Sequence, residues 1–396
     1  MVSTPGLPTI HRRYAGFMVS KSQRQVSREH TGRLARQLSP SELSTAVRIA
    51  SQGPRKNDLR MWREYAEATL FNVSSLQPNH MAFIANGFAR AQVPDREVFN
   101  RMSDQAFRQV DHFEPRDTAL FLNAYAKLQF RDKALFKVFS KAIQRSSSVG
   151  YGEQQLSLLC NAYARLEIAD ADLFKKLGRW TARRVVELTP QGVATVANAY
   201  AKVLISDETL FAALREGIGR NAADFKAQHL ANLLNAFAKL ELREEQVALG
   251  KLATQIPSRA RDFQPIELSQ ALHALVKLEM ASEHRRSVMC LAEAIQEKGE
   301  DFHSRQLALS LHSFSMLNSS YNRLFESLAP HVVSTLGMAD HQSAALIFCA
   351  YARAGEVNGE VMQALLETLQ RSIADAGEQM QVQLFYACGR FGLYKE

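Results

Sequence analysis

A short motif recurs every 37 to 39 residues along most of this chain. Each clear copy runs Asn, Ala or Gly, Tyr or Phe, Ala, Lys or Arg, and an apolar residue. The clear copies begin at Asn86, Asn123, Asn161, Asn198 and Asn235, and degenerate copies begin at His273, His312, Cys349 and Tyr386. Repeats of this length are typical of proteins in which each unit buries its apolar surface against its neighbours. We therefore expect one helical array over residues 76–396 and not two or three separate globules.

Each repeat carries the signals of two helices. When the Asn position of the motif is numbered zero, mostly apolar residues stand at positions −10 and −5, which suits a hydrophobic staple at a helix start. Proline fits the first turn of this helix at position −8, as Pro78, Pro115, Pro190 and Pro265. The first helix, called helix A, is predicted to run from about −9 to +5. Most residues at position +9 are able to cap a second helix, helix B: Asp95, Asp132, Asp170, Asp207, Glu244, Ser282 and Asn358.

The predicted fold class follows from these pairs, because no strand pattern competes with them. It is all-α, an α-solenoid of about nine 37-residue helix-turn-helix repeats, wound as a right-handed or similar superhelix. The Ala and aromatic positions of the motif are expected to pack inside. Residues 41–75 are expected to form capping helices, since a weaker, shifted repeat lies around Ser44 to Ala50.

One stripe of helix A has a chemistry that packing alone does not require. Positions −7, −4, 0 and +4 lie about one turn apart and therefore share a face. They hold, in order, an amide or guanidinium, a small residue, an Asn or His, and a cation. The cations at position +4 are Arg90, Lys127, Arg165, Lys202, Lys239, Lys277, Arg353 and Arg390, with Met316 as the exception, and position 0 holds Asn86, Asn123, Asn161, Asn198, Asn235, His273 and His312. Stacked repeats turn these positions into an amide ladder beside a cationic ladder.

The two ladders indicate a surface for an extended polymer, and single-stranded RNA fits them best. Its phosphates would meet the Lys and Arg row, and its bases would meet the Asn, Gln and His side chains. The small residues at position −4 are expected to let the polymer approach closely. Two other interpretations stay open. An Asn ladder is able to hold an extended peptide, and a cation in the last turn of a helix stabilises that helix end without any ligand.

The net charge of +8 comes from the N-terminus. Residues 1–60 hold eleven Lys and Arg against three acids, which leaves 37 of each for the remaining chain. The array is neutral on average, so any positive surface on it has to come from arrangement. Residues 1–28 contain five basic residues and no acid, a composition typical of mitochondrial presequences. We expect residues 1–40 to be a transit peptide, with a disordered basic arm as the alternative.

Patterns for catalysis and metal binding are missing from the sequence. There is no HExxH, GxSxG or kinase signature, and Cys160, Cys290, Cys349 and Cys388 form no CxxC pair. No stretch approaches the ~20 apolar residues that a membrane-spanning helix needs. We therefore expect a protein with reduced thiols and without enzymatic activity, cofactor, metal site or membrane insertion.

The repeat, a Leu-rich helix A that closes in Asn-Ala-Tyr/Phe-Ala-Lys-Leu, resembles the heptatricopeptide and octotricopeptide repeats of organellar proteins. Their relatives include proteins with RAP or FAST-kinase-like domains and subunits of mitochondrial RNA-editing substrate-binding complexes. The resemblance covers residues 76–396. It implies an RNA-binding α-solenoid, in the mitochondrial matrix in preference to a plastid, that acts in RNA processing, editing or stabilisation or within a mitochondrial ribosome. No RAP module follows the last repeat, so binding is expected in place of cleavage.

Two functions are thus expected. The first is binding of single-stranded organellar RNA, with ribonucleoprotein or ribosomal subunits as further partners. The second is a protein scaffold within a mitochondrial complex. The neutral charge of the array favours the scaffold, whereas the eight aligned cations favour RNA. A continuous positive groove on the helix A face would separate the two.

Overall fold

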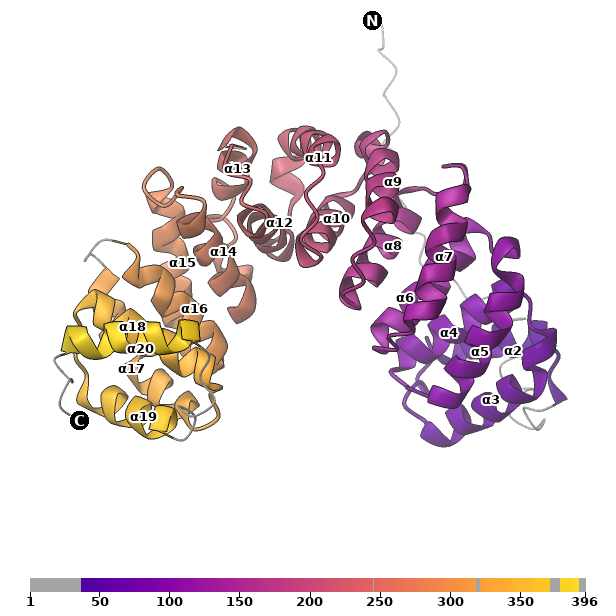
Figure 1. Ribbon diagram of the computed structural model, residues 1–396, viewed down its shortest axis with the longest axis horizontal. Coiled ribbons are helices and arrows are strands. Elements are labelled where there is room, and N and C mark those ends of the chain that lie inside the picture. Colours follow the sequence, from indigo (N-terminus) through magenta and orange to yellow (C-terminus); the bar gives the residue numbers. More distant parts are fainter. Residues whose placement is uncertain (1–36, 245, 318–320, 371–377, 392–396) are drawn as a thin grey trace, which may run out of the picture. The chain divides into compact units, whose positions relative to one another are not determined.

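The computed structural model of the chain describes residues 37–244, 246–317, 321–370 and 378–391 (Figure 1). All regular elements within these ranges are helices, and successive helices pack as neighbours, which confirms the all-α solenoid. Two compact modules make up the chain: the N-terminal module ends at Phe113, and the C-terminal module begins at Glu114. The expected transit peptide or basic arm of residues 1–40 falls almost entirely outside the described residues.

The N-terminal module contains two helix pairs. These are α2 (Pro40–Ala50) with α3 (Leu59–Asn72) and α4 (Pro78–Ala91) with α5 (Arg96–Gln109), and a 3-10 turn follows each of α3 and α5. Helix α2 packs against α4, and α3 packs against α5, as the helices A and B of successive repeats do. The approach of α2 to α4 requires Gly87, because a Cβ atom there would collide with Val47. The segment before the array is therefore a repeat-like pair itself.

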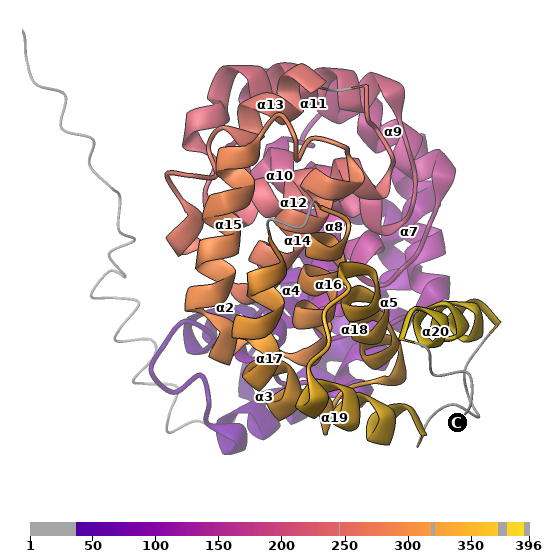
Figure 2. The same ribbon diagram turned by 90° about the vertical axis from the view of Figure 1, so that its left-hand side faces the viewer.

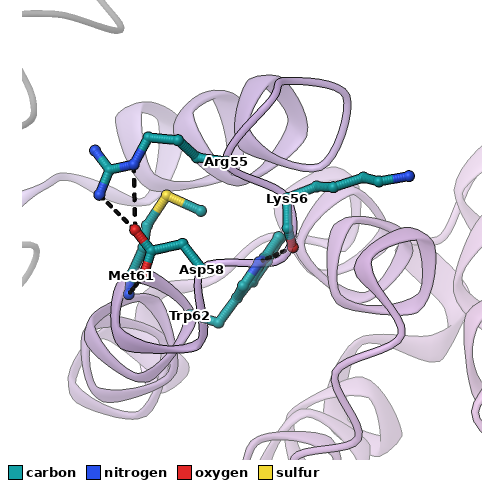
Figure 3. A network of polar contacts seen from close by, with 5 residues as sticks. All are labelled: Arg55, Lys56, Asp58, Met61 and Trp62. Carbon is teal, nitrogen blue, oxygen red and sulfur yellow. Dashed lines mark hydrogen bonds and ion pairs between the residues drawn. The ribbon is translucent and has the colours of Figure 1, made fainter.

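Polar contacts at the start of α3 fix the turn that leads into it (Figure 3). Asp58 caps the helix by accepting from the Met61 N–H at 3.2 Å, and its carboxylate pairs with Arg55 at 2.6 Å. The hydrogen bond from Arg55, followed by that from Met61, lowers the pKa of the Asp58 carboxyl, so the cap stays ionised. Buried Trp62 donates its indole N–H to the Lys56 carbonyl at 2.7 Å, which ties the turn to the module's core.

The C-terminal module continues the same pairs in two layers. Its helices A are α6 (Pro115–Lys127), α8 (Glu153–Arg165), α10 (Pro190–Lys202), α12 (Ala227–Lys239), α14 (Pro265–Lys277), α16 (Ser304–Ser315), α18 (His341–Ala354) and α20 (Glu378–Phe391). Its helices B are α7 (Lys133–Arg145), α9 (Ala171–Ala182), α11 (Glu208–Asn221), α13 (Gln246–Ala253), α15 (Arg285–Glu297), α17 (Asn322–Leu336) and α19 (Gly359–Gln370). Each helix A packs against the next one. Within this module, α10 and α12 lie side by side in one layer, and α11 and α13 lie in the other layer (Figure 1, Figure 2).

The local signals in the sequence set the helix boundaries. Helix A spans positions −8 to +4 in α6, α8, α10, α12 and α14, within one residue of the predicted start and end. Asp132, Asp170 and Asp207 each cap a helix B by accepting from the N–H three residues later at 2.9–3.0 Å. The cap expected at Ser282 is wrong, because α15 begins only at Arg285. Within the described residues, α20 alone represents the ninth repeat.

A tyrosine at position +2 joins neighbouring repeats. The hydroxyls of Tyr163 and Tyr200 donate to the Phe136 and Phe174 carbonyls of the preceding helix B, at 2.7 and 2.6 Å. The paired rings also meet edge to face, with centroids 4.9 and 4.8 Å apart. The contact recurs between α18 and α17, where the Tyr351 hydroxyl donates to the Phe325 carbonyl at 3.0 Å. The aromatic position of the motif is therefore a packing position, as predicted, and it holds helix A in a fixed register on the repeat before it.

Candidate nucleic-acid interface

The stripe of helix A predicted from the sequence divides into exposed and buried positions. Side chains at position −7 are exposed wherever they are described, and those at position +4 are exposed or half-buried. Position −4 is buried in each of the first eight repeats: Ala82, Ala119, Ser157, Ala194, Ala231, Ser269, Ala308 and Ala345. The small residues therefore let adjacent helices A approach one another. The expectation that they admit a polymer was wrong.

Three successive cations form a row across α8, α10 and α12. Arg165, Lys202 and Lys239 occupy position +4 of these helices, and all three are exposed. Partial burial, together with the positive charges of Arg165 and Lys239 on either side, lowers the pKa of Lys202. None of the three makes an ion pair with an acid in the described part of the chain. We call these residues the cation row. Its positive charge is not compensated locally.

Two cations further along the module are held by protein contacts. Lys277 on α14 pairs with the Glu241 carboxylate of the preceding repeat at 3.4 Å. Arg353 on α18 donates to the Ser315 hydroxyl at 3.4 Å. Met316 stands at position +4 of the repeat between them and is 54% exposed. The positive ladder thus weakens beyond α12.

The remaining predicted cations lie outside the row. Lys127 on α6 is half-buried. Arg390 on α20 is exposed, and its Nε–H donates to the Ala352 carbonyl at 3.4 Å. Arg90 is exposed on α4 and belongs to the N-terminal module. The C-terminal module therefore brings together three of the eight predicted cations as uncompensated neighbours.

The predicted base-facing amides at position 0 are less accessible than the cations. Asn123 is 2% exposed, and its Oδ1 atom has no hydrogen-bond donor among the described residues. This burial removes Asn123 from any surface that a ligand reaches. Asn161, Asn198 and Asn235 are half-buried, one turn before the members of the cation row, and Asn86 is half-buried in the N-terminal module. The amide ladder is therefore available beside the cation row and not at α6.

Imidazoles replace the amides at position 0 of α14 and α16. The His273 and His312 rings are half-buried, with centroids 6.4 Å apart. His273 Nδ1 lies 3.4 Å from the Ser313 hydroxyl, and His312 Nδ1 lies 3.5 Å from Arg353 Nη1. Each of these two imidazoles therefore contacts the next helix A.

Sequence reasoning missed position −3, which lies one turn before position 0. Three successive helices A carry polar, half-buried side chains there, namely Thr195, Asn232 and Gln270. Other repeats carry apolar residues at the same position, such as Leu120 and Leu309. The signal was available in the sequence, since −3, 0 and +4 share a helix face, but it is confined to three repeats and is absent from the motif itself.

Other chemistry is limited in the described ranges. No group of three or more His, Cys, Asp or Glu there is arranged to hold a metal ion, and no helix there is long and apolar enough to cross a bilayer. Burial raises the pKa of the Cys160 thiol to about 12 and that of Cys349 to about 11, so both are protonated at neutral pH. A cleft of about 560 Å³ borders α13 and α15 on the helix B side, away from the stripe.

Comparison with known families identifies the chain's relatives. The family model described as RNA-editing substrate-binding complex 6 protein matches residues 188–394, and the one described as RNA-editing substrate-binding complex 8 protein matches residues 17–281. Each match spans more than half of the chain. The chain belongs to the RNA-editing substrate-binding complex proteins. This membership confirms the part of the resemblance that concerned those complexes, and it covers the repeats that carry the cation row.

Other comparisons add little to this family membership. No curated protein matches the chain. Among solved structures, a chain in a homology model of the full-length AP-3 complex in an intermediate open conformation aligns with 89% of this chain and 67% of its own length. The identity is 11% and the TM-score is 0.35, a likeness too weak to imply a shared function.

Proposed function

We propose that this protein binds single-stranded RNA along the helix A face of α8, α10 and α12, as a non-enzymatic subunit of a mitochondrial RNA-editing complex. Membership of a family named for the binding of editing substrates supports the editing role. The heptatricopeptide- or octotricopeptide-like pattern of the repeats supports an RNA ligand. Protein partners within the same complex are part of this proposal.

The cation row carries the proposal. Arg165, Lys202 and Lys239 stand at equivalent positions of adjacent helices, so their charges are spaced by the repeat. A row of exposed cations without acidic partners has an electrostatic cost that a polyanion relieves. The charges of Arg165 and Lys239 add to the effect of burial in lowering the pKa of Lys202. The amides of Asn161, Asn198 and Asn235 lie one turn away, where they are able to meet bases.

The salt dependence of binding tests this proposal. Three phosphate contacts predict that the logarithm of the binding constant for single-stranded RNA falls with the logarithm of salt concentration at a slope of about −2, since each contact contributes roughly −0.7. Fluorescence anisotropy with a labelled oligouridine measures the slope. Duplex RNA of equal length is the control, and it should bind more weakly because its bases are not available to the amides.

The result that contradicts the proposal is a slope near zero, or no binding of single strands at low salt. The cations would then act as helix-end charges, which stabilise a helix by roughly 0.3–1 kcal/mol each without a ligand.

A protein ligand is the second candidate, and two exposed apolar side chains on the stripe favour it. Ile266 at position −7 of α14 is 51% exposed, and Met316 at position +4 of the next repeat is 54% exposed. Both stand where other repeats carry polar or charged residues. They suit an apolar partner surface better than a polynucleotide backbone, which supports a scaffold role as the alternative to RNA binding.

The mitochondrial location rests on the composition of residues 1–28, which are basic and contain no acid. A fluorescent reporter fused to residues 1–40 tests it. Import of the reporter supports the location, and a cytosolic reporter contradicts it.

A further inference from the structure

The two imidazoles at position 0 of α14 and α16 are held in opposite tautomers, and this has a consequence for base recognition. The inference rests on the proposed function and extends it to a strand that continues from α12 onto the neighbouring helices α14 and α16. The partner of each Nδ1 atom sets the tautomer of its ring. A neutral imidazole carries one proton, so the role of one ring nitrogen fixes the role of the other.

The Ser313 hydroxyl sets the tautomer of His273. Ser313 Oγ donates its single proton to the Leu309 carbonyl at 2.7 Å. The same oxygen lies 3.4 Å from His273 Nδ1, and with its proton already used it is able only to accept. His273 therefore carries its proton on Nδ1, and its Nε2 is a bare acceptor.

Arg353 sets the opposite tautomer in His312. The Arg353 guanidinium has only donors, and its Nη1 lies 3.5 Å from His312 Nδ1. His312 Nδ1 therefore accepts, and its Nε2 carries the proton. A further contact, from Arg353 to the Ser315 hydroxyl at 3.4 Å, keeps the guanidinium in place.

Both rings are neutral at pH 7, and neither Nε2 atom is both unpaired and fully buried. Burial, followed by the charge of Lys277, lowers the pKa of His273. Burial, followed by Arg353 and His273, lowers the pKa of His312 to about 4. Neither Nε2 atom has a hydrogen-bond partner in the described part of the chain, and neither is among its fully buried unpaired atoms. Each is thus unpaired and reached by solvent.

We infer that His273 and His312 form a base-reading step, in which a nucleobase N–H donates to His273 Nε2 and an acceptor of the base edge takes the His312 Nε2–H. Because each Nε2 atom has a fixed role as donor or acceptor, the imidazole pair selects between bases in a way that the Asn side chains do not. An Asn amide carries a donor and an acceptor and is able to present either by turning over. The imidazole pair presents one order of acceptor and donor.

A fixed order separates two classes of base. Adenine and cytosine carry an amino donor, N6 or N4, where guanine and uracil carry an oxo acceptor, O6 or O4. The ring nitrogen beside that group has the complementary role. For a base held with one given face toward the pair, this order fits one class and not the other, and the ligand is a base edge and not a sugar or phosphate.

The tautomers are measured first, without RNA. Long-range proton–nitrogen NMR spectra of the full chain with ¹⁵N-labelled histidine distinguish protonated from bare ring nitrogens, and the His273→Asn and His312→Asn variants assign the signals. The inference expects a proton on Nδ1 of His273 and on Nε2 of His312. The same tautomer in both rings overturns the inference and leaves the RNA-binding proposal intact.

Base selectivity is measured next, with labelled oligoadenosine, oligocytidine and oligouridine. The native protein should separate the amino bases from uracil by about fivefold, the scale of one net hydrogen bond. Ser313→Ala and Arg353→Met each free one ring to change tautomer and should bring that ratio close to one. Ser313→Ala, which keeps every cation, should do so with the salt slope unchanged. Both variants suit the fold, because Ala124 and Ala162 occupy the position of Ser313 in other repeats, and Met316 occupies that of Arg353.

The matched control is Asn198→Ala, which removes an amide that is able to present either a donor or an acceptor. It should weaken all three oligonucleotides alike. Unchanged selectivity in Ser313→Ala and Arg353→Met overturns the base-reading role even if the tautomers are opposite. Opposite tautomers together with no RNA binding at all overturn the proposed function, and the base-reading step with it.

Discussion

Replacing Arg165, Lys202 and Lys239 together with glutamate is expected to weaken binding of single-stranded RNA by about 100-fold or more. Losing three phosphate contacts at roughly 1 kcal/mol each removes about two orders of magnitude in affinity, and the new negative charges repel the backbone further. Fluorescence anisotropy at low salt measures the loss. Thermal unfolding of the same variant reports whether the fold is kept, which we expect because all three side chains are exposed.

The control for this variant has the same change of charge on helices B. Lys137, Lys175 and Arg215 are exposed on α7, α9 and α11, so their replacement with glutamate alters the net charge equally. It should reduce RNA affinity far less, because these residues lie away from the stripe. Equal losses in the two triple variants would mean that RNA responds to total charge and not to the cation row. Native binding with a lower melting temperature in the first variant would favour the scaffold role.

Phe174→Ala is expected to destabilise the C-terminal module by about 3–5 kcal/mol, the usual cost of removing a large buried ring. Phe174 is fully buried on α9, its ring meets Tyr200 edge to face, and its carbonyl accepts from the Tyr200 hydroxyl. Urea unfolding followed by circular dichroism measures the loss. An array is stabilised by contacts between neighbours, so the loss should appear as a separate early transition around α9 to α10.

Tyr200→Phe is the graded companion to this variant. It keeps the ring contact and removes only the hydroxyl that donates to the Phe174 carbonyl, so a loss of about 1 kcal/mol is expected. Phe174→Ala with a loss below that of Tyr200→Phe would contradict the packing of repeats described above.

Most of the fold was predictable from the sequence because local signals recur in every repeat. Proline at position −8 and an aspartate at position +9 mark helix starts by their own backbone chemistry, and neither depends on distant contacts. The predicted start and end of helix A hold within one residue. Ser282 failed as a cap because its helix begins later, after His284.

The turn that follows helix A was less predictable. Position +6 adopts the left-handed conformation in Gln129, Glu167, Leu204 and others, with φ values of 55–62°. The N–H of the following residue then closes the helix, as Phe130 does on the Tyr125 carbonyl at 2.9 Å. Glycine usually marks such a position and does so at Gly355, where φ is 73°, but Gln, Glu or Leu stands there in the first six repeats, which hid the turn from sequence reasoning.

The candidate site was predictable only in part, since it depends on contacts between repeats. Position +4 gives eight cations, but the Glu241 side chain that pairs with Lys277 comes from the turn of the preceding repeat. Likewise, the burial of Asn123 and of the small residues at position −4 follows from how closely adjacent helices A pack. Helix periodicity gives the face of a residue, and it does not show which part of that face a neighbouring helix covers.

Lysine footprinting tests most directly whether RNA lies along the helix A face of the C-terminal module. The full chain is acetylated briefly with and without a saturating single-stranded oligonucleotide, and mass spectrometry measures the reactivity of each lysine. Lys202 and Lys239 should be protected by RNA, whereas Lys137 and Lys175, exposed on helices B, should react equally in both samples. Protection of Lys137 and Lys175 with unchanged reactivity of Lys202 and Lys239 would contradict the proposed interface.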